Sequence, residues 1–377
     1  MRARAAPLWL STPSRWAALP QRHARWVAGL LVLLVLASWL ALAAPGPPPV
    51  SGDAANRADD QADVVLYEGI VDGVRHGGNY YQVAADALRA GDYPLRPFVT
   101  FRLPTLAVVE AAMPDWMAVA LLWLLAGCVF AAWYGRLHPA FGRWPPRVIA
   151  MALLAGGMMA FVQPGLTHFH EIWAGLLVAL SLALRRRGRW LEAAAFGLAA
   201  VLIRETAALY IGVMAAIAWA EGERREAIGW AGVAAVLAVA VALHAQAVAQ
   251  VVRPLDPVSP GWSGMLGFGF FVRTMAISTA LDLAPLWLAA PLVALALAGW
   301  ASWRDALGLR VVATFAAYAA LLAVAGRADT FYWGLLVAPL LLVGLAFALD
   351  GVRDLVAGVH DSRRITVTRL VRGERGA

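Results

Sequence analysis

Cysteine, lysine and charged residues in general are scarce in this chain. Of its 377 residues one is cysteine, and all 31 basic residues are arginine. The single Cys128 cannot form an internal disulfide, which excludes a disulfide-stabilised scaffold and dithiol redox chemistry. Only 15% of the residues are charged, whereas a soluble domain has about 25%. These shortages exclude a soluble enzyme and a disordered chain.

Apolar residues are what the chain has in excess. They make up 61% of the sequence, which contains 17 Trp, and the mean hydropathy is +0.67. A transmembrane helix needs roughly 20 consecutive apolar residues. We therefore predict an all-α polytopic membrane protein with about ten transmembrane helices. The predicted spans cover residues 26–44, 114–134, 148–163, 171–184, 190–204, 206–220, 227–249, 284–301, 309–326 and 333–349.

We attribute the net charge of +7 to the way arginines are distributed across a membrane, and not to binding of a nucleic acid. If the N-terminus is cytoplasmic, most of the 31 arginines fall on the cytoplasmic side of these spans and most of the 24 acidic residues fall outside. This distribution follows the positive-inside rule. We expect a multi-pass protein of the cell inner (plasma) membrane, with both termini in the cytoplasm and no nucleic-acid partner.

The predicted organisation has a cytoplasmic tail (1–25), a transmembrane domain (26–349) and a second cytoplasmic tail (350–377). The first apolar run ends in Leu40 to Ala44, which resembles a signal-peptide cleavage site. The run is long for a signal peptide, so we favour an uncleaved anchor. In both cases the next loop, 45–113, is external.

Arg204 and Glu205 interrupt an apolar stretch that runs from Leu191 to Ala220. A single helix would place this charged pair in the middle of the membrane, at a cost of several kcal/mol for each unpaired charge. Two short helices with the pair at the outer turn avoid that cost. We therefore predict two helices here.

The loop 45–113 is far longer than a connection requires. After a Pro-rich leader, apolar residues recur at helical spacing from Asp63 to Val74, and Gly77-Gly78 ends this helix. A second helix runs from Tyr80 to about Gly91, and Pro104 marks the start of a third. The first two are amphipathic, which favours helices that lie on the membrane surface.

Five short motifs lie at the predicted external side: Asp63-x3-Tyr67-x2-Ile70, Gly77-x2-Tyr80-Tyr81-x2-Ala84, Glu171-Ile172-Trp173, Arg204-Glu205-Thr206 and Gly326 to Tyr332. Together they resemble the GT-C glycosyltransferases, integral membrane enzymes that use lipid-phosphate-linked sugars. The resemblance implies an acidic active-site residue and two juxtamembrane helices in the loop after the first span. Asp63 lies further from that span than the acidic residue of many relatives, which leaves Asp53, Asp59 and Asp60 as competitors.

The reaction of such an enzyme needs a base and a phosphate-binding cation, and the sequence offers candidates for both. Transfer of a sugar from a polyprenyl phosphate to a hydroxyl needs a base, for which we choose Asp63 and then Glu68. The alternatives are a helix N-cap for Asp63 and a solvated helix face for Glu68. The anionic leaving group needs bidentate cations. Our phosphate-binding candidates are Arg204, Arg327 and Arg102, with ion pairs to Glu205 and Asp329 as the alternative for the first two.

The remaining candidates are polar or aromatic residues near the predicted external helix ends. We expect them to bind the sugar or the acceptor: Tyr80, Tyr81, His168, His170, Glu171, Glu205, Asp329 and Tyr332. His168, His170 and Glu171 also suit a metal, but no fourth ligand is nearby in sequence, so we predict neither a metal nor another cofactor. For His244, inside an apolar helix, we expect a hydrogen bond between helices.

The segment 253–282 is rich in Pro and Gly and lacks a phosphate-loop lysine, so we expect a connecting loop or a lid over the donor site. The sequence favours a glycosyltransferase that acts on an envelope lipid or glycan acceptor on the external side. The alternatives are a transporter or flippase, and an inactive partner in envelope polysaccharide assembly. A transporter would place charges along the membrane midplane, where these spans have almost none.

Overall fold

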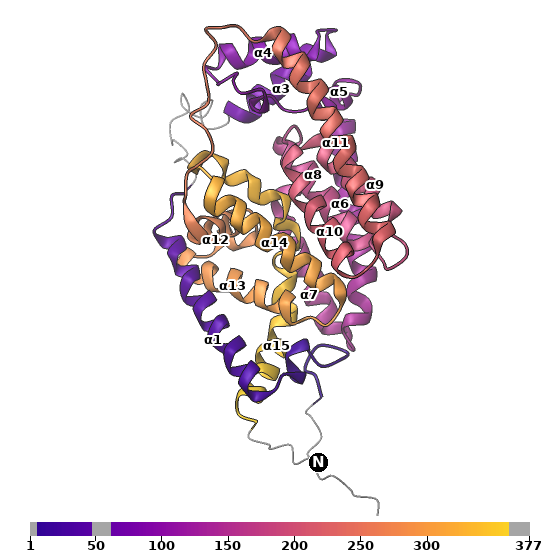
Figure 1. The fold of residues 1–377 in the computed structure, drawn as a ribbon, viewed down its shortest axis with the longest axis vertical. Coiled ribbons are helices and arrows are strands. Elements are labelled where there is room, and N and C mark those ends of the chain that lie inside the picture. Colours follow the sequence, from indigo (N-terminus) through magenta and orange to yellow (C-terminus); the bar gives the residue numbers. More distant parts are fainter. Residues whose placement is uncertain (1–5, 47–61, 362–377) are drawn as a thin grey trace, which may run out of the picture.

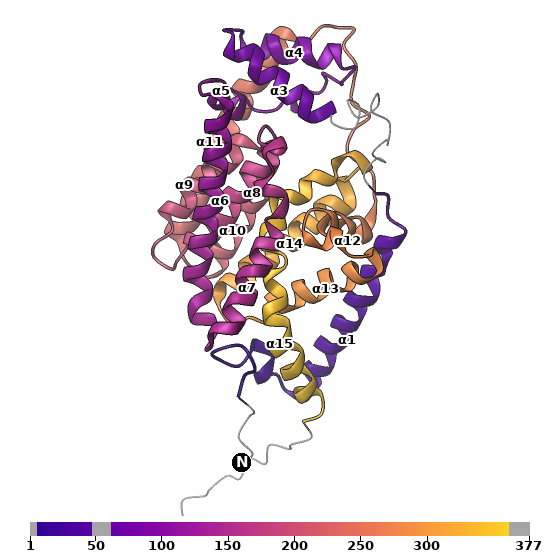
Figure 2. The ribbon, with the colours of Figure 1, turned by 180° about the vertical axis from the view of Figure 1, so that it is seen from behind.

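The computed structural model describes residues 6–46 and 62–361. It is 76% helical, and the described residues form no strand. Asp53, Asp59 and Asp60 lie outside the described residues. The molecule is elongated (Figures 1 and 2). The helices α3 (Ala62–Arg75), α4 (Tyr80–Ala90) and α5 (Thr105–Ala111) lie at one end, which we call the cavity end.

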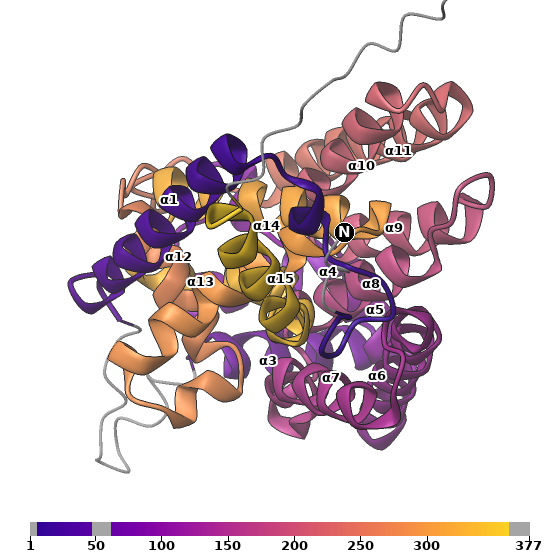
Figure 3. The same cartoon turned by 90° about the horizontal axis from the view of Figure 1, so that it is seen from below.

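The described parts of both chain termini meet at the opposite end, which we call the terminal end. Asp350 of α15 (Val343–Val359) accepts hydrogen bonds from the backbone of Leu8, Trp9 and Leu10. Seen from this end, α15 lies in the middle, between α1 and α13 on one side and α7 on the other (Figure 3).

Within residues 6–46 and 62–361, four helical segments are long and apolar enough to cross a membrane. They are α1 with its 3-10 extension (Gln21–Leu42), α6 with its extension (Asp115–Ala140), α11 (Arg224–Val251) and α14 (Ala306–Ala325). Large apolar side chains such as Leu33, Leu124 and Val239 are about 60% exposed on them. Apolar surface of this extent indicates contact with lipid.

Shorter apolar helices fill the space between these four segments. They are α7 (Trp144–Gly157), α8 (His170–Leu184), α9 (Leu191–Ile203), α10 (Ala208–Ala220), α12 (Gly267–Ile277) and α13 (Leu286–Ser302). The most central is α8, in which every residue from His170 to Ala183 is buried. A helix that is apolar on all sides belongs in the interior. Its first turn reaches the cavity described below.

The predicted break between residues 204 and 206 is confirmed. Ile203 ends α9, Arg204 is extended (φ −138°, ψ 107°), and a 3-10 turn (Glu205–Ala207) leads into α10. At the far end of α8, Arg185 pairs with Glu226 in the first turn of α11. The charged residues of these four helices therefore gather at the two ends of the molecule.

The three helices predicted after the first span are confirmed as helices. In α3, Tyr67, Ile70 and Val71 are buried while Glu68 and Asp72 are exposed, as its apolar spacing requires. Gly77 adopts φ +90°, which lets the chain turn sharply between α3 and α4. Asn79 caps α4 by accepting a hydrogen bond from the backbone of Tyr81.

The regular helix expected over 333–349 is wrong. Residues Ala328–Leu336 and Ala338–Leu340 form 3-10 turns, and α15 begins only at Val343. Pro339 has no backbone N–H to donate, which disfavours a regular helix through this apolar run. Helices also extend past both predicted tail boundaries, because α1 begins at Gln21 and α15 crosses position 350.

The expectation of a loop throughout 253–282 is also wrong, because α12 occupies Gly267–Ile277. Phe270, Phe271 and Met275 of α12 are fully buried. Gly269 lies directly against the backbone at Leu40, where a side chain would not fit. The glycines that suggested a loop therefore allow α12 to pack closely against the end of α1.

The arginines sort between the two ends as predicted from their positions in the sequence. At the terminal end lie Arg136, which donates to the carbonyl of Arg185, and Arg353, which donates to that of Ala6. Arg310 lies there as well and binds Glu221, which also contacts Arg185. The cavity end holds Arg75, Arg89, Arg102, Arg204 and Arg327.

Candidate active site

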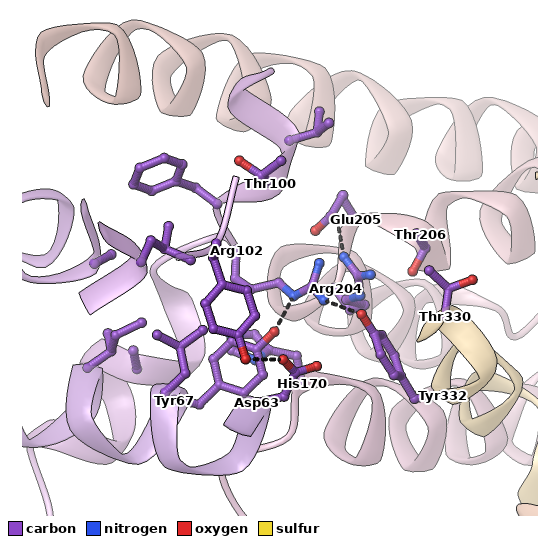
Figure 4. Close-up of a pocket in the computed structure, with 18 of the residues that line it drawn as sticks. Asp63, Tyr67, Thr100, Arg102, His170, Arg204, Glu205, Thr206, Thr330 and Tyr332 are labelled. Atoms are coloured by element: carbon purple, nitrogen blue, oxygen red, sulfur yellow. Dashed lines mark hydrogen bonds and ion pairs between the residues drawn. The ribbon is translucent and has the colours of Figure 1, made fainter. Parts of the chain in front are cut away.

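A cavity of about 490 Å³ lies between the helices of the cavity end and the upper ends of the apolar helices. Its apolar wall comes mainly from α3 and α4. Its polar wall comes from several segments that are far apart in sequence, some of which Figure 4 shows together. The polar and charged lining residues include Asp63, Arg102, Glu110, His168, His170, Arg204, Glu205, Arg327, Asp329 and Tyr332.

Asp63 lies in the first turn of α3 and faces this cavity. Its Oδ1 accepts a hydrogen bond of 2.8 Å from the hydroxyl of Tyr93. Burial, together with the nearby charge of Asp63, raises the pKa of Tyr93, so the phenol stays protonated and remains a donor. Oδ2 has no partner among the described residues. One carboxylate oxygen is thus fixed and the other faces the cavity.

Arg102 is the cavity cation with the least compensation. Its Nε donates to the hydroxyl of Tyr67 over 3.0 Å, and its Nη2 donates to that of Tyr332 over 3.4 Å. The nearest carboxylate, Glu171, is 3.9 Å away. The hydroxyl of Tyr80 holds the Arg102 carbonyl at 2.7 Å. Because neutral phenols are its main partners, most of its positive charge is available to an anion.

Arg204 is compensated by two carboxylates. It is 1% exposed, and its Nε lies 2.5 Å from Oε1 of Glu171. Its Nη1 is bonded to Glu205. The ion pair considered for Arg204 from the sequence is therefore present. A buried arginine between two carboxylates holds the break between α9 and α10 against the start of α8.

Arg327 lies at the rim of the cavity and is paired as well. Its Nη2 is 2.5 Å from Oδ2 of Asp329, and its Nη1 donates to the carbonyl of Gly261 over 3.4 Å. Both charged side chains are substantially exposed, 31% and 53%. This is the alternative that we considered for Arg327 from the sequence.

His168 and His170 both line the cavity, His168 from the turn that leads into α8 and His170 from the first turn of that helix. His168 is hydrogen-bonded to Glu110 of α5, which is buried. His170 is 3% exposed, and neither of its ring nitrogens has a partner among the described residues. Sequence reasoning missed Glu110. The available signal was a single carboxylate one turn after Leu106, on the buried face of an otherwise apolar helix.

The other predicted residues divide between the cavity and its surroundings. Glu68 is exposed and does not line the cavity. The hydroxyl of Tyr81 lies 3.2 Å from Nδ1 of His244, which confirms the predicted bond between helices, here α4 and α11. Tyr80 and Tyr332 line the cavity, and Glu171 lies behind Arg204.

Several buried polar atoms around the cavity have no partner among the described residues. Leaving such an atom unsatisfied costs about 1–3 kcal/mol. A polar ligand would recover part of that cost. The atoms are Oε1 of Glu110, both ring nitrogens of His170, Oε2 of Glu171, Oε2 of Glu205, Oγ1 of Thr206 and Nε1 of Trp333.

The described residues contain no group of three or more His, Cys, Asp or Glu side chains arranged to hold a metal ion. His168 is engaged with Glu110 and Glu171 with Arg204, so the His-x-His-Glu run does not converge on one point. The cavity instead offers a carboxylate, a cation and a histidine–carboxylate pair.

No protein-family model, curated protein or solved structure matches this chain. The function must therefore be inferred from the geometry of the cavity.

Proposed function

We propose that the protein is an integral membrane glycosyltransferase that moves a sugar from a polyprenyl-phosphate donor to a lipid or glycan acceptor of the cell envelope. The observation that carries the proposal is that Asp63 and Arg102 face one cavity at the end of an apolar helical bundle. Such a site lets the apolar chain of the donor stay in lipid while the sugar and phosphate reach polar groups.

The proposed topology has ten crossings and both termini in the cytoplasm. The spans are α1, α6 to α11, α13, α14 and the segment 328–359, with α3 and α4 on the external membrane surface. Support comes from the gathering of arginines and of both described chain ends at the terminal end. The positive-inside rule then assigns the terminal end to the cytoplasm.

In this reaction the acceptor oxygen forms a bond to the anomeric carbon as the bond from that carbon to the phosphate oxygen breaks. The acceptor proton passes to the free oxygen of Asp63, and the electron pair of the broken bond stays on the phosphate. Arg102 binds that phosphate through its guanidinium. Tyr67 and Tyr332 orient Arg102, and Tyr93 orients Asp63.

The distribution of charge favours this enzyme over a transporter. Among the described residues the buried charges lie towards the two ends, and the helices between them carry almost none. A transport path would need polar groups along its length. An inactive assembly partner would not need a weakly compensated arginine in a cavity, because a buried charge that is weakly paired is costly.

The test is transfer by purified protein. Radiolabelled polyprenyl-phosphate sugars are incubated in turn with the protein and membrane lipids, and labelled lipid is separated from donor. We expect at least one donor to label the lipid fraction with wild type and not with Asp63→Asn at matched folded concentration. Equal labelling by both preparations would refute the assignment of the site. No labelling by wild type with any sugar of the panel would contradict the proposed function.

A further inference from the structure

Glu110 and His168 form a pair on the cavity wall that the displacement described above does not use. Nδ1 of His168 lies 2.8 Å from Oε2 of Glu110. Glu110 reaches the cavity from α5 and is 1% exposed, whereas His168 comes from the turn before α8. Nε2 of His168 has no partner among the described residues. A buried carboxylate thus holds one imidazole nitrogen, and the other is left for a ligand in the cavity.

The pair is suited to keep a proton near neutral pH. The hydrogen bond to Glu110 raises the pKa of the His168 imidazole above its ordinary value, and burial raises the pKa of the Glu110 carboxyl. Two coupled groups with raised pKa values titrate as one unit that retains a proton. Asp63 is a separate carboxylate on α3, and its free oxygen can accept a proton. Acid and base roles are often divided between two such groups.

The charge balance of the cavity calls for a proton donor. When the sugar leaves, the polyprenyl phosphate gains a second negative charge. Arg204 is compensated by two carboxylates and Arg327 by Asp329, so Arg102 is the least compensated of the three lining arginines. One cation offsets only half of a dianion, and the remainder is costly next to buried groups such as Arg204 and His170.

We propose that His168, held by Glu110, is the general acid of the transfer and donates its Nε2 proton to the departing phosphate. This inference rests on the proposed function. The bond from the anomeric carbon to the phosphate oxygen breaks, its electron pair stays on that oxygen, and a phosphate oxygen receives the proton of His168. Asp63 receives the acceptor proton. A proton returned from Asp63 to His168 through water resets both groups.

The acid and the leaving group are matched in proton affinity. The second pKa of a phosphate monoester is about 6, close to that of an imidazole. A proton can therefore pass between them without a large change in free energy. The donor itself is a phosphate diester, which has no proton to lose in this range. A fall in kcat at alkaline pH would therefore reflect the titration of a group on the enzyme and not of the donor.

Other ionisable groups face His168 from the surrounding helices. They are Glu68 of α3, Asp115 of α6 and His170 of α8. Glu68 is exposed and therefore screened. Asp115 is paired with Arg75 at 2.6 Å, and the same arginine donates to the carbonyl of Glu110. Glu110 is the one carboxylate hydrogen-bonded to His168, so it should set the titration of the pair.

The first test is the pH dependence of kcat and KM. For wild type we expect kcat to fall as pH rises through the pKa of the pair. His168→Gln should lower kcat by about 10²-fold, remove this alkaline limb and leave KM nearly unchanged. Glu110→Gln should move the limb to lower pH, because the imidazole loses its carboxylate partner. His76→Gln, at an exposed histidine directly after α3, is the control and should match wild type.

Three outcomes would overturn the proposal. His168→Gln could retain both kcat and the alkaline limb, in which case the imidazole donates no proton. The loss could fall on KM alone, which would make His168 a binding group. The rate of wild type could instead rise with pH through the limb that His168→Gln removes, which would make it a base.

A second test does not depend on turnover. The product analogue farnesyl phosphate is titrated into wild type, His168→Gln and His76→Gln at several pH values. If the imidazolium shares its proton with the phosphate, affinity for wild type should fall about tenfold as pH rises through the pKa of the pair, and His168→Gln should lose this dependence. The same pH dependence in all three proteins would refute the role of His168 as the general acid, whether or not sugar transfer is found. Transfer by wild type without this dependence would leave the proposed function in place and reject the acid alone.

Discussion

The two ends of the molecule each contain buried arginines and glutamates, but their hydrogen bonds differ. At the terminal end, Arg185 binds both oxygens of Glu226 at 2.8–2.9 Å, and Arg310 binds both oxygens of Glu221 at 2.6–2.8 Å. At the cavity end, Glu171 and Glu205 each keep one buried oxygen without a partner among the described residues.

This difference separates a structural cluster from a candidate site. In the terminal cluster two arginines satisfy two carboxylates completely, so it ties α8, α10, α11 and α14 together and has no carboxylate oxygen left for a ligand. In the cavity cluster, donors and acceptors remain available. Variants at the cavity end should therefore lose turnover, whereas variants at the terminal end should lose stability.

The largest effect is expected at Asp63. Asp63→Asn keeps the size of the side chain and a hydrogen-bond acceptor for Tyr93, but it removes the ability to take a proton. Turnover should fall by roughly 10²–10⁴, with little change in donor binding. The measurement is single-turnover transfer of labelled sugar. Asp72→Asn, an exposed carboxylate on the same helix, is the matched control and should keep wild-type turnover.

The next effect is expected at the terminal end and should appear in stability. Glu226→Ala leaves Arg185 buried with only the longer contact to Glu221, 3.4 Å. Removal of one partner from a buried pair costs about 3–5 kcal/mol. Thermal or denaturant unfolding in detergent should show this loss, while donor affinity per folded molecule stays unchanged. An unchanged melting temperature would mean that the terminal cluster does not hold the four helices together.

A smaller effect is expected at Arg102 and should fall on donor binding. A hydrogen bond to a charged group contributes about 1.5–3 kcal/mol, so Arg102→Ala should weaken donor affinity by about 10- to 100-fold. Arg102→Lys keeps the charge without the bidentate fork and should lie between Ala and wild type. Donor affinity measured on folded protein decides this. Equal affinity of all three proteins would remove Arg102 from the phosphate site.

The smallest effect is expected at Arg327, which is paired with an exposed Asp329. An exposed ion pair contributes about 0–1 kcal/mol, so Arg327→Ala should lower thermal stability only slightly. We expect Arg327→Ala and Arg327→Lys to change donor affinity by less than about threefold. A graded loss from Arg to Lys to Ala at constant stability would instead assign Arg327 to the donor phosphate, as we first proposed from the sequence.

Local sequence patterns predicted the helices around the cavity well. Apolar spacing located α3 and α4, and the pair Arg204-Glu205 marked the break between α9 and α10, because a charged pair is expelled from the middle of an apolar helix. The same patterns failed at 333–349. There an apolar composition suggested one continuous helix, but Pro339 interrupts a regular helix.

The order of importance among the charged candidates could not be predicted. Arg204, Arg327 and Arg102 look alike in sequence, since each lies near a helix end. Their difference lies in partners that come from distant segments: Arg102 meets Tyr332, 230 positions away, and Arg204 meets Glu171, 33 positions away. Glu110 was missed for the same reason, because its partner His168 is 58 positions further along the chain.

The sequence alone determined the class of the protein, the positions of most helices and the separation of its arginines between two ends. These properties depend on composition and on contacts within one or two helical turns. Over that range the position of a residue in the sequence determines which face of the helix it occupies. Only the tertiary structure decided which arginine is least compensated, which histidine is held by a carboxylate and which polar atoms face the cavity. Each of these depends on side chains brought together by helix packing, and the free energy of a buried charge is set by such neighbours rather than by the residue itself.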